Sequence, residues 1–239
     1  MFFNLGSPPK GPPPPFAAWS SRQLKVLDKA IVLAWGQTMA TSRGRTLLAS
    51  GTEAEITAML QDAITQLLGS ETLHGFSPAA FGAPIRGQEL EDYSGTRLEK
   101  RPDLTITRLS ARPAINHNAM FYECKILGRG RTVDDYITHG VMRFQNGNYA
   151  WGMPHAGMIG YVAAGHRTDA KASLIERWTH TKSPAPCAPL YGMVEDHSMN
   201  PVIAISIHAR TFMLRNGEAP GNIMLRHMWL SEPPASVTP

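Results

Sequence analysis

The sequence predicts an α/β protein in which a central mixed β-sheet is flanked by helices. Segments 20–35 and 52–68 repeat apolar residues at intervals of three and four, which is the spacing of helices that bury one face. Segments 104–109 and 119–127 are instead short, rich in branched and aromatic residues, and bounded by polar residues and glycine, as strands are. Helical segments and strand segments in one chain favour a layered α/β domain.

The chain is long enough for one such domain. It has 239 residues, of which 43% are hydrophobic, so a core of ordinary size can form. We expect a single domain over residues 19–230, a proline-rich arm over 1–18 and a flexible tail over 231–239. In the arm, the segment SPPKGPPPP lacks most of the N–H donors of a hydrogen-bonded ladder, which favours an extended, polyproline-like conformation.

Charge and cysteine content narrow the class of protein. The 23 Lys and Arg residues exceed the 19 Asp and Glu residues, so the formal net charge is +4, which permits a nucleic-acid partner without requiring one. Cys124 and Cys187 are too few for a disulfide framework or a four-ligand zinc site. No apolar run approaches the ~18 residues that span a bilayer, and the N-terminus lacks the features of a signal peptide. We therefore expect a cytoplasmic protein without a membrane partner.

Two helices are expected in the N-terminal part of the chain. Ser20 or Ser21 can cap the first, which packs through apolar residues as far as Trp35. The segment SRGRT at 42–46 is expected to be a loop. The second helix, at 52–68, has a buried face made of apolar residues at helical spacing, namely Ile56, Met59, Leu60, Ala63, Ile64, Leu67 and Leu68.

Two acids stand at the start of the second helix and have different expected roles. Glu53 projects from the border of the buried face. Glu55 falls off that face, and the spacing Thr52-x-x-Glu55 fits a capping box, which gives Glu55 a structural role. Both acids also favour the positive end of the helix dipole.

The next elements are strands. Residues 69–100 are expected to form a loop and a short, polar first strand, and a hairpin connection joins the strands at 104–109 and 119–127. Because side chains alternate between the two faces of a strand, Glu123 and Lys125 share one face. These charges lie inside an apolar run, and buried charges need partners or a metal.

The rest of the chain is expected to alternate helices and strands. Thr132 or Asp134 can cap a helix directly after the strand that carries Lys125. Apolar residues at 151–164 have the spacing of a second buried helix, and a short helix is expected at 170–178. Two more strands are expected at 201–210 and 222–230, in which His208 and Arg210 are secondary candidates for a substrate groove.

The residues at the two central strands form a known pattern. Asp103 follows Pro102, and Glu123 and Lys125 come about twenty positions later on the neighbouring strand. This arrangement of PD followed by E-x-K resembles the PD-(D/E)XK nuclease superfamily. The resemblance implies a restriction-endonuclease-like core of order αβββαβ, to which this chain adds an N-terminal helix and C-terminal strands.

The resemblance also implies a catalytic metal site. Asp103 and Glu123 would hold Mg²⁺ or Mn²⁺, with the backbone carbonyl of Cys124 as a third ligand. Lys125 would orient or help to deprotonate the attacking water, with a pKa lowered by partial burial.

The resemblance also implies roles for the helices before and after these two strands. The helix before the strands contributes another acid to the metal site, for which Glu53 is the first candidate and Glu55 the second. The helix after the E-x-K strand borders the nucleic-acid groove. The candidates for contacts to nucleic acid on this helix and on the GRGR segment before it are Arg129, Arg131, Arg143 and Gln145.

The function expected from these residues is metal-dependent hydrolysis of phosphodiester bonds, with DNA favoured over RNA. The sequence contains no recognisable sequence-reading module, which favours a non-specific enzyme or one directed by a partner protein or a second copy. Two alternatives stay open. One is a catalytically inactive nuclease-like fold that binds nucleic acid or assembles with other proteins, and the other is an unrelated α/β protein in which the pattern arose by chance.

Overall fold

The fold is described from a computed structural model that covers residues 15–94, 101–109, 117–163, 169–180 and 186–233. Its helices are α1 (Ser21–Ala40), α2 (Ser42–Ser50), α3 (Glu53–Ser70), α4 (Val133–Tyr136), the π-helix η1 (Ile137–Val141), α5 (Met142–Gln145) and α6 (Ala170–Thr179). Its strands are β1 (Leu104–Thr107), β2 (Ala119–Leu127), β3 (His155–Val162), β4 (Val194–Asp196), β5 (Ile203–His208) and β6 (Ile223–Leu230).

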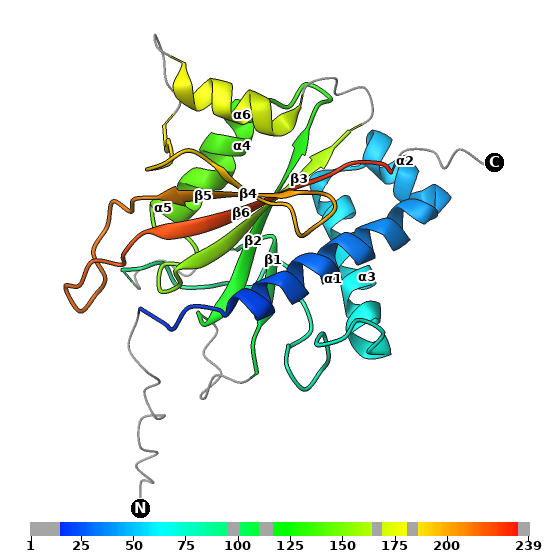
Figure 1. The fold of residues 1–239 in the computed structure, drawn as a ribbon, viewed down its shortest axis with the longest axis horizontal. Coiled ribbons are helices and arrows are strands. Elements are labelled where there is room, and N and C mark those ends of the chain that lie inside the picture. The colour runs from blue at the N-terminus through cyan, green and yellow to red at the C-terminus, as the bar shows by residue number, and fades with distance from the viewer. Residues whose placement is uncertain (1–14, 95–100, 110–116, 164–168, 181–185, 234–239) are drawn as a thin grey trace, which may run out of the picture.

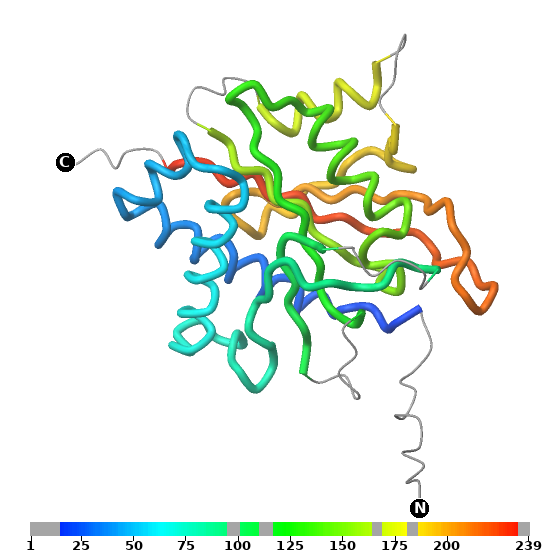
Figure 2. The backbone as a smooth tube through the Cα atoms, turned by 180° about the vertical axis from the view of Figure 1, so that it is seen from behind, coloured from blue at the N-terminus to red at the C-terminus, as the bar shows by residue number. Residues whose placement is uncertain are grey.

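The six strands form one mixed sheet in the order β1-β2-β3-β6-β5-β4. The central strands β2, β3 and β6 run parallel, whereas β1, β5 and β4 each pair antiparallel with their neighbours. Helices α1 to α3 lie on one side of the sheet and α4 to α6 on the other (Figures 1 and 2). The expected α/β class, with a mixed sheet flanked by helices, is confirmed.

Strand β2 lies between the edge strand β1 and β3, and it carries two of the candidate site residues. All nine of its residues are buried. It pairs with β1 through Leu104 and Tyr122 and with β3 through Glu123 and Met158. A strand covered by helices on both faces reads as a nearly continuous apolar run, which is why Glu123 and Lys125 stand among aromatic and aliphatic residues.

The N-terminal helices begin where the sequence indicates. Ser20 forms a capping box at the start of α1, and Thr52 forms one at the start of α3, in each case with the side chain three residues later. The expected loop at 42–46 is wrong, because these residues begin α2. The side chain of Thr41 caps that helix by accepting from the N–H of Gly44 at 2.9 Å, and Leu48 buries its inner face.

The helix expected at 151–164 is wrong as well, because most of this segment is strand β3. The segment is a continuous apolar run, and such a run does not separate a buried helix from a strand that is buried on both faces. Gly157 shows why the strand form fits. A Cβ atom there would lie 2.2 Å from the ring of Tyr122 on β2, so only glycine allows the two strands to pair.

Between β2 and β3 the chain forms a composite helix made of α4, η1 and α5. Thr132 caps it through a capping box with Asp135. The middle of this helix is a π-helix, and such segments are frequent at functional sites. The helix lies on the side of the sheet opposite to α3, so elements from both sides reach the C-terminal half of β2 (Figure 1).

The remaining predictions have mixed outcomes. The helix at 170–178 and the strands at 201–210 and 222–230 correspond to α6, β5 and β6, whereas β4 was not expected. Instead of a short first strand, the described part of 69–100 contributes two isolated bridges to the β1 segment, from Phe81 to Arg108 and from Ile85 to Thr105. Most of the expected N-terminal arm, hairpin connection and C-terminal tail lie outside the described residues. Within the described ranges no helix is long and apolar enough to cross a membrane.

Candidate active site

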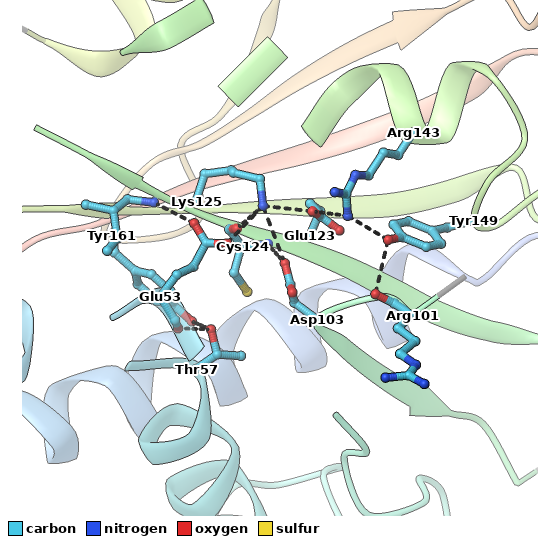
Figure 3. Close-up of polar contacts among 11 residues, drawn as sticks. Glu53, Thr57, Arg101, Asp103, Glu123, Cys124, Lys125, Arg143, Tyr149 and Tyr161 are labelled. Atoms are coloured by element: carbon cyan, nitrogen blue, oxygen red, sulfur yellow. Dashed lines mark hydrogen bonds and ion pairs between the residues drawn. The ribbon is translucent and has the colours of Figure 1, made fainter. Parts of the chain in front are cut away.

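Four charged side chains from three parts of the chain meet beside the C-terminal half of β2 (Figure 3). The ammonium Nζ of Lys125 lies 2.8 Å from Oε1 of Glu123, 3.0 Å from Oε1 of Glu53 and 3.7 Å from Oδ2 of Asp103. It also donates to the carbonyl oxygen of Cys124 at 2.7 Å. Three carboxylates therefore converge on one cation, and they come from α3, from the residue before β1 and from β2.

The end of β1 explains how two of these carboxylates are positioned. Strand β1 pairs with β2 only as far as Tyr122, so the next N–H groups on that edge of β2 need other acceptors. Asp103 accepts from the N–H of Cys124 at 2.7 Å, and Glu53 accepts from the N–H of Ile126 at 3.2 Å. The backbone of β2 thus fixes the two acids two residues apart along its edge.

Glu123 is the most deeply buried acid of the site. Its side chain is 0% exposed, and its Oε1 lies 2.8 Å from both Nζ of Lys125 and Nη1 of Arg143. Its other oxygen, Oε2, has no hydrogen-bond partner among the described residues. A buried carboxylate oxygen without a donor is costly, and it is the kind of atom that a bound cation satisfies.

The charges of the site shift the pKa values of its groups. Burial raises the pKa of Glu123 to about 8, and the nearby charge of Asp103 adds to this, while Lys125 and Arg143 oppose it. Burial alone would lower the pKa of Lys125, but the charges of Glu123, Asp103 and Glu53 outweigh burial and raise it above its ordinary value. The expected lowering of the Lys125 pKa is therefore wrong, because three carboxylates surround the ammonium group.

A cleft of about 350 Å³ adjoins Glu53 and Lys125. Arg129, Arg131 and His139 add a basic lining, and Asp135 is a second acid in the cleft beside Glu53. Arg129 has a left-handed backbone (φ 56°), which is uncommon for a residue with a side chain and costs energy. Its guanidinium donates to the carbonyl oxygen of Gly51 at 2.8 Å, which holds the side chain at the wall of the cleft.

The structure does not bring every predicted residue to the site. Glu55 is exposed, and its Oε2 accepts from the N–H of Thr52 at 2.8 Å in the capping box. Gln145 accepts from Sγ of Cys187 at 2.7 Å. The secondary candidates are occupied elsewhere. His208 is buried against Ser206 at 2.7 Å, and the guanidinium of Arg210 donates to the carbonyl oxygens of Ala150, Trp151 and Met153.

Two residues at the site were missed by sequence reasoning. His139 reaches the cleft from the π-helix, whose geometry has no clear sequence signal. Tyr149, from the turn after α5, accepts from Nη1 of Arg143 at 2.7 Å. A tyrosine in a loop has no spacing rule that connects it to a strand, so only the assembled fold reveals this contact.

The oxygen atoms gathered at the site are of the chemical type that a hard divalent cation prefers. Asp103, Glu123 and Glu53 supply carboxylate oxygens, Cys124 supplies a carbonyl oxygen, and Mg²⁺ and Mn²⁺ prefer oxygen ligands. The unpartnered Oε2 of Glu123 agrees with this chemistry. As the side chains stand, the described residues contain no group of three or more His, Cys, Asp or Glu side chains arranged to hold an ion. The ammonium of Lys125 lies 2.8–3.7 Å from an oxygen of each of the three acids.

Comparisons with protein-family models, with curated proteins and with solved structures found no match to this chain.

Proposed function

We propose that the protein is a metal-dependent nuclease that hydrolyses phosphodiester bonds of nucleic acid. One observation carries this proposal: carboxylates from three separate elements converge on Lys125 at the edge of a cleft with a basic lining. As in the αβββαβ core that the resemblance implies, α3 precedes the strands that carry the acids, and a helix and β3 follow them. The described residues hold two strands, β1 and β2, between α3 and that helix in place of three. We also propose that the enzyme cuts without sequence specificity or is directed to its substrate by a partner protein or by a second copy of the chain.

The residues proposed to hold Mg²⁺ or Mn²⁺ are Asp103, Glu123 and the carbonyl of Cys124, with Glu53 beside them. A bound divalent cation would supply a nucleophilic water at neutral pH and offset charge on the scissile phosphate. The protein's own part is to present these oxygens together. The backbone of β2 does so, because it holds Asp103 through the N–H of Cys124 and Glu53 through the N–H of Ile126.

We assign Lys125 the role of a charged hydrogen-bond donor, and not that of a general base. Its raised pKa keeps the ammonium charged at neutral pH, so the group donates hydrogen bonds and does not accept a proton. In the proposed reaction it orients the attacking water and stabilises negative charge on the phosphate. Its partly exposed side chain, 11% open, lines the cleft from which substrate would approach.

The basic cleft is proposed to bind the phosphate backbone next to the reacting bond. Arg129, Arg131 and His139 line it, and Arg129 is already fixed by the carbonyl of Gly51. Contacts to phosphate carry no sequence information, which agrees with an enzyme that cuts non-specifically. DNA is the substrate we favour, and RNA is tested beside it.

The test measures cleavage of labelled single-stranded and double-stranded DNA and RNA by the purified protein with Mg²⁺ or Mn²⁺. We expect cleavage that EDTA stops, and Lys125→Ala should lower its rate by about 10²–10⁴-fold. Lys171→Ala is the matched control, since Lys171 on α6 pairs with Glu195 away from the site. Wild-type protein that cuts none of these substrates, or a Lys125→Ala variant that cuts normally, would refute the proposal.

The alternative of a non-cleaving subunit has one observation in its favour. Two cations, Lys125 and Arg143, already lie 2.8 Å from the same oxygen of Glu123, so the acid is paired within the protein itself. The same experiment separates the two functions. Binding to nucleic acid without cleavage under any of the metal conditions would favour the inactive binding or assembly subunit.

A further inference from the structure

A chain of hydrogen bonds leads away from the buried acid Glu123 (Figure 3). Nη1 of Arg143 lies 2.8 Å from Oε1 of Glu123 and donates to the hydroxyl oxygen of Tyr149 at 2.7 Å. The hydroxyl of Tyr149 in turn donates to the carbonyl oxygen of Arg101 at 3.1 Å. This series of hydrogen bonds therefore starts on β2, passes through α5 and the following turn, and ends on the segment before β1.

The direction of donation in this series of hydrogen bonds is fixed. An arginine side chain donates and does not accept, so the Tyr149 oxygen accepts from Arg143. A carbonyl oxygen only accepts, so the single proton of the Tyr149 hydroxyl points to Arg101. Each group is used in the one role open to it. Phenylalanine at this position would remove both bonds and leave the ring in place.

Tyr149 is held firmly by its surroundings. Only 4% of the residue is exposed. The backbone N–H groups of Asn148 and Tyr149 both donate to the carbonyl oxygen of Arg143, at 2.9 and 3.4 Å, which ties the turn to the end of α5. The guanidinium of Arg143 also lies 5.7 Å from the centre of the Tyr149 ring. These contacts fix the position of the Tyr149 side chain between Arg143 and the polypeptide segment before β1.

The segment reached by Tyr149 carries the second acid of the site. Asp103 is two residues after Arg101, and the intervening Pro102 is buried and has a restricted backbone. The Asp103 carboxylate accepts from the N–H of Cys124 on β2. Asp103 is therefore held from two directions, by β2 through its side chain and by Tyr149 through the backbone of Arg101.

We propose that Tyr149 is a positioning residue that sets the separation of Asp103 and Glu123 by linking both to one hydroxyl group, through Arg101 and Arg143. Its role in metal binding rests on the proposed function. Tyr149 acts through other residues, since its hydroxyl contacts Arg143 and the Arg101 carbonyl and touches neither acid directly.

A first experiment needs no metal. The N–H of Cys124 is bonded to Asp103, so its hydrogen exchange reports how firmly Asp103 is held. We expect Tyr149→Phe to speed exchange at Cys124 by about two- to tenfold. Tyr136→Phe is the matched control, because it also removes one buried tyrosine hydroxyl, bonded to His227 at 2.8 Å, outside the site. It should leave exchange at Cys124 unchanged.

A second experiment measures binding of Mn²⁺ to the substrate-free protein by calorimetry. Residues that orient metal ligands usually change affinity by about 10–100-fold, so we expect binding to Tyr149→Phe to be at least about tenfold weaker than to wild type and to Tyr136→Phe. Wild-type protein that binds no Mn²⁺ would refute the metal site of the proposed function, and Cys124 exchange would then decide the positioning role alone.

Two outcomes would overturn the inference. If Tyr149→Phe matches wild type in Cys124 exchange, the hydroxyl does not position Asp103. If Tyr149→Phe and Tyr136→Phe speed that exchange equally, Tyr149 only supports the fold in the way that any buried tyrosine does.

Discussion

Two polar clusters are buried against the same sheet and differ in charge and access. The site cluster, made of Glu53, Asp103, Glu123 and Lys125, is ionic and borders a cleft. The histidine network, made of Tyr136, Ser206, His208 and His227, is neutral and at most 1% exposed. Both combine residues that are far apart in the sequence, so each could serve stability.

The histidine network can form its three hydrogen bonds with one order of protons, and it leaves Nδ1 of His208 without a partner among the described residues. Tyr136 lies 2.8 Å from Nδ1 of His227, and the hydroxyl of Ser206 lies 2.7 Å from Nε2 of both His227 and His208. If Tyr136 donates to His227, then His227 donates to Ser206 and Ser206 donates to His208. Both imidazoles stay neutral in that order, so the network needs no ligand to complete these three bonds.

The site cluster is ionic instead. It gathers three acids around one lysine, and it leaves Oε2 of Glu123 without a donor among the described residues. Proteins tolerate such uncompensated groups mainly where function requires them. The two clusters are alike in burial and in having one unpartnered polar atom, and they differ in net charge and in access to a cleft. This difference predicts opposite responses to pH.

The largest expected effect is a loss of stability in acid, caused by the histidine network. Burial lowers the pKa of His227 to about 3 and that of His208 to about 4, below the ordinary value of 6.5. Stability from the neutral forms is therefore present above pH 6.5 and is lost as the pH falls toward 4. Between pH 7 and 4.5 the free energy of unfolding should fall by about 3–5 kcal/mol, measured by urea denaturation.

Variants show whether the histidines cause this loss. His208→Gln removes one of the two groups that must take up a proton, so its stability should fall less steeply below pH 6.5 than that of wild type. His197→Gln replaces an exposed histidine, whose side chain is 73% open, and should follow the wild-type curve. Identical slopes for all three proteins would mean that the network does not resist protonation.

The site cluster should show the opposite dependence in metal-free protein. Burial, and then the charge of Asp103, raise the pKa of Glu123 from 4.5 to about 8. The stability that a protonated acid with a raised pKa contributes is fully present below pH 4.5 and is lost as the pH rises toward 8. The free energy of unfolding should fall by about 2–3 kcal/mol between pH 6 and 8 relative to Glu123→Gln, which cannot ionise.

Added Mn²⁺ provides the check on this second prediction. A cation bound at the site would favour the ionised carboxylate, so it should restore stability at pH 8 in wild type and not in Glu123→Gln. Parallel stability curves for the two proteins without metal would show that Lys125 and Arg143 already keep Glu123 ionised. The contrast between the two clusters would then be one of access only.

The core of the site could be predicted because it follows strand and helix periodicity. Alternation along β2 places Glu123 and Lys125 on one face, and helical spacing places Glu53 at the border of the buried face of α3. Both rules are local. The fold class followed from the same rules, since long periodic helices and short strands with branched residues differ in length and composition.

The rest could not be predicted because it depends on how elements meet. Strand β3 was mistaken for a helix, since burial on both faces removes the alternation that marks a strand. The raised pKa of Lys125 results from three carboxylates brought together by the fold. Tyr149 and His139 reach the site from a turn and from a π-helix, and neither element has a spacing rule that connects it to β2.

The smallest predicted effect is a gain of stability at the site cluster. Asp103→Asn keeps an oxygen that can accept from the N–H of Cys124, while it removes one of three negative charges and lowers the repulsion on Glu123. Lys125 loses only its most distant acidic partner, at 3.7 Å. In metal-free protein at pH 8 we expect the free energy of unfolding, measured by urea denaturation, to rise by about 0.5–1 kcal/mol. In the separate cleavage assay with Mg²⁺ or Mn²⁺, the same variant should lose activity.

Asp62→Asn, which neutralises an exposed acid on α3, is the matched control and should change stability little. The sign of the Asp103→Asn effect decides between two explanations of the acid. A gain in stability together with lost cleavage means that the carboxylate is kept for chemistry at the expense of the fold. A loss of more than about 1 kcal/mol would instead mean that Asp103 mainly ties β1 to β2, as a neutral hydrogen-bonded group of the histidine network ties its strands.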